Sequence, residues 1–249
     1  MAQNIYDDPA FFAGYSDFPR SRLGLEGTAE WPSVRALLPE VAGRRVVELG
    51  CGFGHLSRWL ADQGAAEVLG LDLSERMLDG ARRATKQPSI RYARADLDAV
   101  ELEALSADLV VSSLTLHYVA DFSRLCRTVH DALVPGGAFV FSVEHPIYSA
   151  RAVPEWVEAA DGRQAFAITD YGLEGPRRTN WIVDGVLKYH RSIATMLNSL
   201  AEAGFSYRRM EEWRPSEAQL AHHPEWRETE LVRPMFLLIA VDKPPMGAN

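Results

Sequence analysis

The glycine-rich segment Glu48–Gly54 is the part of the sequence whose residue types and spacing most directly indicate a chemistry. It reads Glu-Leu-Gly-Cys-Gly-Phe-Gly, between a short apolar run and an amphipathic segment. Glycines between a strand and a helix allow positive φ angles and let a ligand approach the backbone closely. The segment therefore predicts a nucleotide-type ligand at the carboxyl end of the preceding strand.

Two kinds of ligand are compatible with such a turn, and neighbouring residues separate them. A dinucleotide site has the pattern G-x-G-x-x-G and presents a helix N-terminus to a pyrophosphate. Here His55 stands where the third glycine of that pattern belongs, and the carboxylate of Glu48 would repel a pyrophosphate. S-adenosyl-L-methionine (SAM) carries an ammonium and a sulfonium group, which a carboxylate attracts. The turn therefore favours SAM.

Acidic residues also follow the next two expected strands. Asp72 stands where a carboxylate accepts hydrogen bonds from the ribose hydroxyls, a feature that NAD and SAM sites share. Asp96 could accept a bond from the adenine amino group, with Leu97 against the ring. Each aspartate alone could equally be a helix cap or a turn residue. Acids at three successive strand ends, counting Glu48, are harder to explain as caps.

Alternating hydrophobic patterns indicate the elements that position these residues. Apolar runs predict strands, and amphipathic spacing predicts helices between them. The expected strands are 45–49, 68–73, 90–94, 108–113 and 138–143, and the expected helices are 55–63, 75–85 and one from Asp121 to Pro135. Strict alternation predicts an α/β fold with a parallel sheet covered by helices. After a helix at 192–203, strands at 205–212 and 235–241 are expected to form an antiparallel pair.

We expect one domain over residues 1–249. Residues 1–43 form an aromatic arm and a short helix, and 44–144 form the ligand-binding core. Residues 145–191, rich in turn residues and aromatics, are expected to form a substrate lid, because long loops in compact domains are usually functional. Residues 192–249 supply the last helix and the strand pair.

Methyl transfer needs alignment of the reactants, and it needs a base only when the acceptor must lose a proton. The candidates for that base, or for a group that orients the acceptor, are His117, Glu144, His145, Tyr189, His190 and Arg191, and the expected catalytic residues among them are His117, His145 and His190. His117 could instead be a hydrogen-bonded residue beneath the pocket, and His145, before a proline, could simply turn the chain. The candidate substrate-binding residues are Arg20, His117, Glu144, Tyr189 and Arg191. The arginines suggest a carboxylate or phosphate on the acceptor, unless they are solvated or structural.

These segments together resemble the class I SAM-dependent methyltransferases, in particular the ubiquinone/menaquinone-type (methyltransferase type 11) subgroup. The matching segments are 46–54, 70–74, 95–97, 108–113, 116–119 and 133–137. A bacterial branch of uncharacterised methyltransferases shares the further segments 11–16, 144–147 and 188–192, and this resemblance names no acceptor.

The resemblance implies a Rossmann-like, doubly wound, three-layer α/β/α fold with seven strands, the last of them antiparallel. It also implies SAM as cofactor and S-adenosyl-L-homocysteine as product. Glu48 and Cys51 are included because they belong to the turn. The expected cofactor-binding residues are Tyr15, Glu48, Gly50, Cys51, Gly52, Gly54, Asp72, Leu73, Met77, Asp96, Leu97 and Ser112. Met77 could equally be core, and Tyr15 a packed aromatic of the arm.

Composition limits the remaining possibilities. The 249 residues are 47% hydrophobic, enough for one substantial core, and the formal net charge of -8 argues against nucleic-acid or anionic-membrane partners. Two isolated cysteines, Cys51 and Cys126, provide neither a disulfide framework nor a metal-ligand spacing, so we expect reduced thiols and no metal. We see no signal peptide or membrane-spanning run, and therefore expect a cytoplasmic protein, monomeric or homodimeric.

Three functions fit these observations. The first is a methyltransferase acting on an O, N or C atom of a small molecule. The second is a methyltransferase acting on protein or RNA, although the sequence has no basic stripe to bind RNA. The third is a SAM-binding protein without catalysis.

Overall fold

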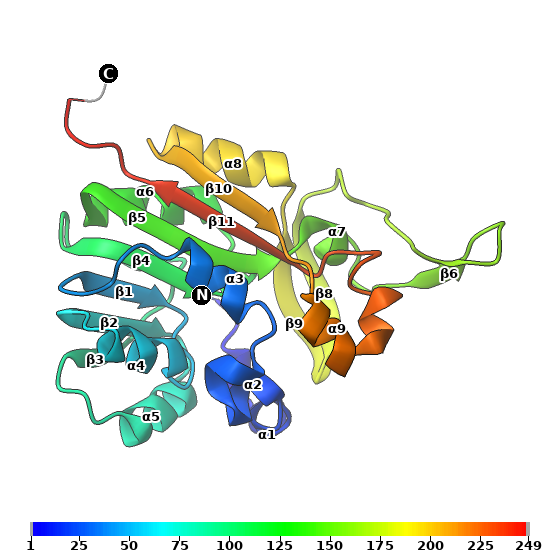
Figure 1. The fold of residues 1–249 in the computed structure, drawn as a ribbon, viewed down its shortest axis with the longest axis horizontal. Helices are drawn as coiled ribbons and strands as arrows, with labels where there is room; N and C mark the ends of the chain where they lie inside the picture. The colour runs from blue at the N-terminus through cyan, green and yellow to red at the C-terminus, as the bar shows by residue number, and fades with distance from the viewer. Residues whose placement is uncertain (1, 248–249) are drawn as a thin grey trace.

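The computed structural model describes residues 2–247, and its central feature is one seven-stranded sheet (Figure 1). The strands lie in the order β10-β11-β5-β4-β1-β2-β3. All neighbours are parallel except β11, which is antiparallel to both β5 and β10. Their bounds are β1 Arg45–Leu49, β2 Glu67–Asp72, β3 Ile90–Arg94, β4 Ala107–Ser113, β5 Leu133–Glu144, β10 Ser206–Glu212 and β11 Phe236–Asp242. The expected Rossmann-like class is confirmed.

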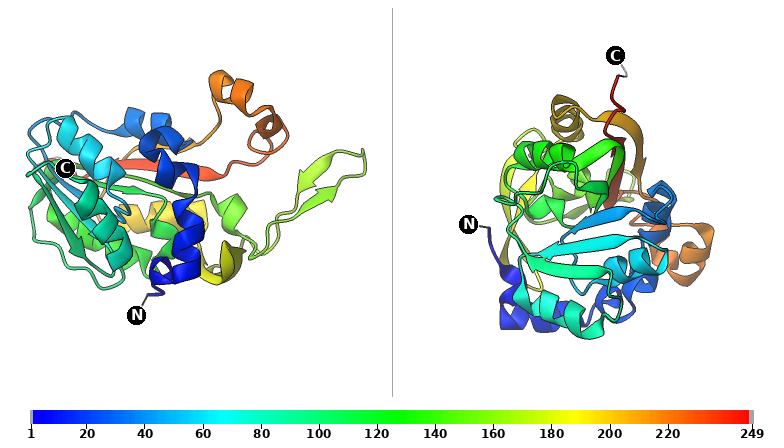
Figure 2. Two further views of the ribbon diagram at one scale, coloured as in Figure 1. Left: turned by 90° about the horizontal axis from the view of Figure 1, so that it is seen from below. Right: turned by 90° about the vertical axis from the view of Figure 1, so that its left-hand side faces the viewer.

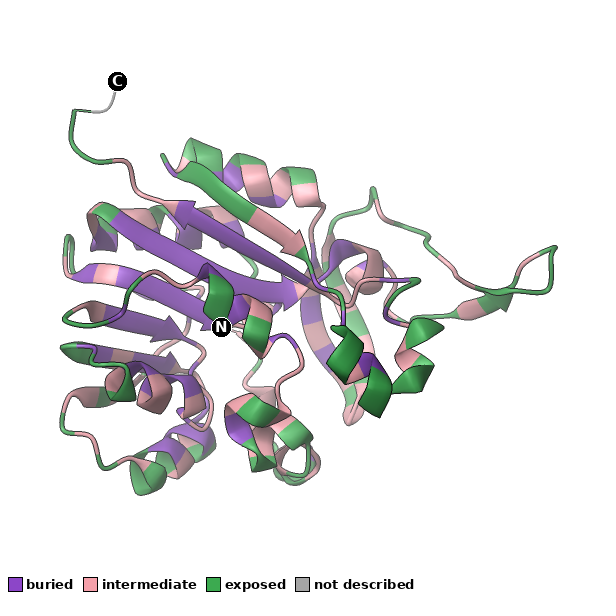
Figure 3. Cartoon of the chain, viewed as in Figure 1, coloured by how far each residue is buried: buried purple, intermediate pink, exposed green. Residues whose placement is uncertain are grey.

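Helices cover both faces of this sheet. They are α3 Trp31–Leu37, α4 His55–Asp62, α5 Glu75–Ala84, α6 Phe122–Ala132 and α8 Ile193–Glu202. Successive strand residues point to opposite faces, so Val46 joins a core with α3 and α4, while Val47 joins a core with α6 and α8. Figure 3 shows the central strands buried along their length, as in sheets covered on both faces.

Polar caps set the starts of the helices. Ser74 accepts a hydrogen bond from the backbone N–H of Met77 at the start of α5, and Asp121 caps α6 through Arg124 N–H. The expected extension of α6 to Pro135 is wrong. The helix ends at Ala132, and residues 133–137 already belong to β5, where Gly136 and Gly137 exchange backbone hydrogen bonds with Lys243.

The N-terminal arm and the segment 145–191, which lie outside the core, are both folded. The arm contains η1 Ile5–Asp7, α1 Pro9–Ser16, α2 Pro19–Arg22 and η2 Gly24–Gly27. The expected lid consists of α7 Pro146–Ser149 and two antiparallel hairpins, β6 Trp156–Glu158 with β7 Gln164–Phe166, and β8 Gly175–Trp181 with β9 Val183–His190. Figure 2 shows β6–β7 projecting from the body.

Short helices complete the chain. Helix η3 Leu116–Tyr118 follows β4, and α9 Glu217–His222 and η4 Pro224–Arg227 lie in the connection between β10 and β11. None of the helices within residues 2–247 is both long and apolar enough to cross a membrane.

The two cores predict a large penalty for truncation in β4. Leu109 is fully buried at the centre of the sheet, so we expect Leu109→Ala to lower the free energy of unfolding by about 2–5 kcal/mol through lost burial and a residual cavity. Leu173, 66% exposed, gives the matched control Leu173→Ala, expected within about 0.5 kcal/mol of wild type. Urea unfolding followed by circular dichroism measures both. Equal stability of the two variants would contradict this packing.

Candidate active site

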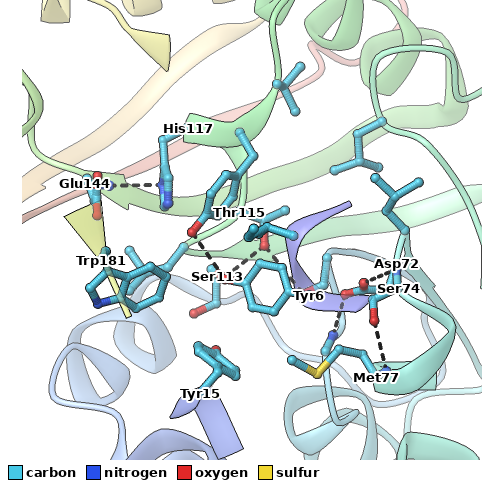
Figure 4. Close-up of a pocket in the computed structure, with 18 of the residues that line it drawn as sticks. Tyr6, Tyr15, Asp72, Ser74, Met77, Ser113, Thr115, His117, Glu144 and Trp181 are labelled. Carbon is cyan, nitrogen blue, oxygen red and sulfur yellow. Dashed lines mark hydrogen bonds between the residues drawn. The ribbon is translucent and has the colours of Figure 1, made fainter. Parts of the chain in front are cut away.

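A cavity of about 410 Å³ opens at the carboxyl ends of the parallel strands (Figure 4). Its walls come from the glycine turn after β1, the ends of β2 to β5, the N-terminal arm and hairpin β8–β9. In open α/β sheets this edge is where ligands bind. The cavity thus lies at the edge of the sheet where the sequence predicted a ligand, and the arm and hairpin contribute to its walls.

The glycine turn is shaped by contacts that only glycine allows. Gly50 and Gly52 have φ angles of 76° and 51°. A Cβ on Gly50 would overlap the hydroxyl of Thr115, whereas a Cβ on Gly52 would meet no atom within 4 Å. Because both glycines line the cavity, Gly52 leaves room for a ligand against the backbone.

Asp72 ties this turn to the end of β2. Its Oδ2 accepts the backbone N–H of Gly52 at 2.8 Å, and its Oδ1 accepts that of Ser74 at 2.9 Å. Burial raises the pKa of Asp72 to about 6, against the lowering effect of these two N–H groups. The carboxylate lines the cavity and keeps lone pairs that can accept further hydrogen bonds.

The neighbouring wall extends to the end of β3. Asp96 lines the cavity together with Leu73, Leu97 and Met77. Its Oδ1 accepts the N–H of Asp98 at 3.0 Å, and its Oδ2 accepts the N–H of Ala2 at 3.2 Å. Met77 is 1% exposed, so most of its side chain is core.

The N-terminal arm contributes residues that the sequence alone did not identify. Asp7 accepts a 2.5 Å hydrogen bond from the Ser74 hydroxyl and a 3.1 Å bond from Arg76 N–H. The ring of Tyr6 lies in the cavity and packs edge-to-face on Tyr15, 5.0 Å between centroids. The aromatic composition of the arm was the only signal for this contribution. Tyr15 both lines the cavity and packs within the arm.

Four predicted cofactor residues are not in the cavity wall, because each is held by the protein. The Glu48 carboxylate accepts the Ser57 hydroxyl, and burial raises its pKa to about 8. The Ser112 hydroxyl donates to Leu49 O at 2.7 Å. A Cβ on Gly54 would overlap Tyr92, and the Cys51 thiol is buried, with its pKa raised by that burial. These residues support the turn.

His117 lies in the cavity wall after β4. Its Nδ1 accepts the backbone N–H of Glu144 at 3.4 Å, drawn in Figure 4. Burial lowers its pKa to about 4. The imidazole is therefore neutral at pH 7, and the contact at Nδ1 places its proton on Nε2.

Glu144 forms a buried ion pair that sequence analysis missed. Its Oε1 lies 2.5 Å from Nζ of Lys188 on β9, and the two side chains are 14% and 7% exposed. Nζ also lies 4.7 Å from the ring centroid of Trp181. Burial would raise the pKa of Glu144, but His117 and Lys188 lower it below its ordinary value. The segment Val183–His190 shows no alternation of apolar and polar residues that would have marked Lys188 as buried.

Arg20 and Glu30 form the second charge pair at the cavity. Both residues belong to the cavity wall, and Arg20 Nη2 lies 2.6 Å from Glu30 Oε1. Glu30 is 1% exposed, and sequence analysis did not single it out. Arg20 was predicted to bind an acidic acceptor. It lines the cavity, but Glu30 already balances its positive charge.

Three other candidates lie outside this cavity. His145 Nδ1 accepts the N–H of Ile147, so this residue caps α7 and turns the chain. The ring nitrogens of His190 lie 3.2 Å from Ser149 Oγ and 2.9 Å from Tyr171 O. Arg191 donates to the carbonyls of Val119 and Ala120. Tyr189, by contrast, lines the cavity. Within residues 2–247 no group of three or more His, Cys, Asp or Glu could hold a metal ion.

Residues 47–141 match the family model of the methyltransferase domain. The crystal structure of an S-adenosylmethionine-dependent methyltransferase from Mesorhizobium loti is 55% identical, covers 88% of this chain and 100% of that chain, and superposes with a TM-score of 0.84. The chain belongs to the SAM-dependent methyltransferases. This methyltransferase is also 35% identical to an uncharacterized Haemophilus influenzae protein, over 90% of this chain and 89% of the other.

Two relatives with named acceptors match a shorter part of the methyltransferase. The malonyl-[acyl-carrier protein] O-methyltransferase of Enterobacter lignolyticus is 35% identical over 51% of this chain. The trans-aconitate 2-methyltransferase of Variovorax paradoxus is 35% identical over 56%. The chain covers 48% and 49% of these two relatives, about half their length.

The wall around the glycine turn fits SAM on chemical grounds. Carboxylates suit a ligand that carries an ammonium, a sulfonium and two ribose hydroxyls, and Asp72 keeps acceptor capacity there. The open side of Gly52 leaves space beside the backbone. SAM supplies a methyl group that the sulfonium has already activated for transfer.

Removing the Asp72 carboxylate should weaken SAM binding. We expect Asp72→Ala to lower the affinity by roughly 1.5–3 kcal/mol, the range for hydrogen bonds to a charged group. Isothermal titration with SAM measures this change. Asp79→Ala, at an exposed aspartate of α5, is the matched control and should bind like wild type. Unchanged affinity in Asp72→Ala would show that the ribose does not lie against this carboxylate.

The raised pKa of Glu48 predicts a specific pH dependence of stability. The folded protein keeps a proton on Glu48 up to about pH 8, whereas the unfolded chain releases it near 4.5. The protonated form of Glu48 therefore contributes fully to the free energy of unfolding below pH 4.5. This contribution is lost as pH rises to about 8, by up to about 1.4 kcal/mol per pH unit.

Glu48→Gln should remove that contribution. The unfolding free energy of wild type relative to Glu48→Gln should fall as pH rises from 5 to 8, measured by urea unfolding at each pH. The exposed Glu202→Gln controls for the loss of a carboxyl group. Parallel pH curves for wild type and Glu48→Gln would show that Glu48 is ionised in the folded protein.

Proposed function

We propose that this methyltransferase transfers the methyl group of SAM to a small-molecule acceptor. The observation that carries the proposal is the enclosure of the cavity. Its volume is about 410 Å³, and the arm and hairpin β8–β9 both contribute to its walls. A cavity of this size lies in the ordinary range of small-molecule sites, and in this proposal it holds the acceptor beside the cofactor. The name of the trans-aconitate relative gives a small-molecule precedent.

In this proposal the cofactor occupies the end of the cavity between the glycine turn and Asp96. Asp72 accepts hydrogen bonds from the ribose, and Asp96 and Leu97 contact the adenine. Tyr15 covers the cofactor from the arm, and residues 145–191 serve as the acceptor lid. Support comes from the position of these residues around one cavity. The outlying Glu48, Cys51, Gly54 and Ser112 then maintain the turn without contacting the ligand.

The acceptor occupies the other end, beside His117, Glu144 and Tyr189. Positioning and exclusion of water account for much of the rate in such a displacement, so the chain's main task is to orient the acceptor. His145, His190 and Arg191 then act on the reaction only through the shape of the lid, because protein groups already occupy their polar atoms.

A methyl-transfer screen tests the proposal against its rivals. The protein is incubated with SAM carrying a radiolabelled methyl group and a bacterial extract divided into metabolites, RNA and protein. We expect label in the metabolite fraction. Label confined to protein or RNA would favour a macromolecular acceptor. SAM binding by calorimetry without transfer to any fraction would favour a non-catalytic SAM-binding protein.

A further inference from the structure

We infer that the acceptor is an uncharged molecule that presents an O–H or N–H group to Glu144, and that Glu144 receives its proton. This inference rests on the proposed small-molecule function and names the class of its acceptor. It follows from how the charged side chains around the acceptor end are paired.

The charged side chains that line the cavity at this end are paired with opposite charges. Within residues 2–247, Arg20 is the one arginine or lysine in the cavity wall, and Glu30 balances it at 2.6 Å. Lys188 lies behind the wall and is paired with Glu144 at 2.5 Å. Arg191, the other arginine predicted to bind an anion, is bonded to backbone carbonyls outside the cavity. A carboxylate on the acceptor would therefore lie beside the Arg20–Glu30 pair, whose charges already balance.

Glu144 has acceptor capacity left on one oxygen. Lys188 occupies Oε1, and no donor from the described part of the chain lies on Oε2. Oε2 is not among the fully buried polar atoms that lack a partner. The Glu144 side chain is 14% exposed and lies in the cavity wall. The ion pair keeps this carboxylate ionised while a ligand can still reach it. A carboxylate of this kind binds a hydrogen-bond donor and repels an anion.

His117 provides a hydrogen-bond donor beside the hydrogen-bond acceptor Glu144. The backbone N–H of Glu144 points at its Nδ1, so the neutral ring carries its proton on Nε2 and cannot take another there. His117 can orient an oxygen or nitrogen of the acceptor, and the base is Glu144. The rings of Tyr6, Tyr15 and Trp181 form an apolar wall beside them (Figure 4), which suits a flat, uncharged body.

The reaction balances with these groups. The acceptor O or N forms a bond to the methyl carbon while the sulfur–methyl bond breaks. The sulfur keeps that electron pair and becomes a neutral thioether. The proton of the acceptor O–H or N–H passes to Oε2 of Glu144, so no oxidant or metal is required.

A matched pair of probes tests the acceptor class. 4-Methylcatechol and 3,4-dihydroxybenzoate share a ring and two hydroxyls and differ in a methyl against a carboxylate. Calorimetry on the wild-type protein saturated with S-adenosyl-L-homocysteine should show at least tenfold tighter binding of 4-methylcatechol. Equal or tighter binding of the benzoate, or no binding of 4-methylcatechol at millimolar concentration, overturns the inference. Label confined to protein or RNA in the extract screen would instead overturn the proposed function.

Variants of the ion pair test the role of Glu144. Glu144→Gln should reduce methyl transfer to 4-methylcatechol at least 100-fold and leave affinity for S-adenosyl-L-homocysteine within twofold, and Glu202→Gln should change neither. The titratable groups that face Glu144 are His117, Tyr118, Tyr148 and Lys188. Since Lys188 lowers the pKa of Glu144, Lys188→Met should move the acidic limb of kcat/KM to higher pH, and Lys188→Arg should restore it. An unmoved limb, or full activity of Glu144→Gln, overturns the assignment.

Discussion

The hydrogen bonds that Asp72 accepts from backbone N–H groups hold the site together. The turn after β1 has positive φ angles, and while Gly50, Cys51 and Gly54 donate to backbone carbonyls, Gly52 donates its N–H to the Asp72 side chain. Asp72 accepts the N–H of Gly52 and, through its other oxygen, that of Ser74. Ser74 in turn caps α5 and donates to Asp7 of the arm. One carboxylate thus links the turn, the second strand, a helix and the arm around the cofactor end.

The acceptor end depends on a different kind of link, which joins the sheet to its lid. β5 ends at Glu144, and β9 carries Lys188, so their ion pair fastens hairpin β8–β9 over the cavity. Buried pairs of this kind contribute little net stability, because desolvation offsets their attraction. Their effect here is geometric, since the pair fixes the hairpin that carries Trp181 and Tyr189. The same pairing balances the charge of Lys188 beside the cavity.

The sequence predicted the sheet, its strand positions and the acids that line the cavity, because those features depend on local patterns. Apolar runs, helix caps and acids at strand ends are visible in a few adjacent residues, and Asp72 and Asp96 line the cavity as expected. The partners of each charge depend on contacts between distant segments. Glu30 and Lys188 were missed for this reason, and His190 looked available although the lid occupies its nitrogens. The hairpins of the lid were missed because turn-rich segments show little periodicity.

Glu48 and Glu144 show why residue type alone could not assign roles. Glu48 is the last residue but one of β1 and Glu144 is the last of β5, and the sequence suggested that both carry a negative charge toward a ligand. Glu48 is enclosed and accepts the hydroxyl of Ser57, and burial outweighs this contact and favours its neutral acid. Glu144 is buried beside a lysine, which favours its ionised form. In the proposed function, Asp72 and Asp96 therefore supply the charge that attracts the cofactor, and the carboxylate of Glu144 takes the proton of the acceptor.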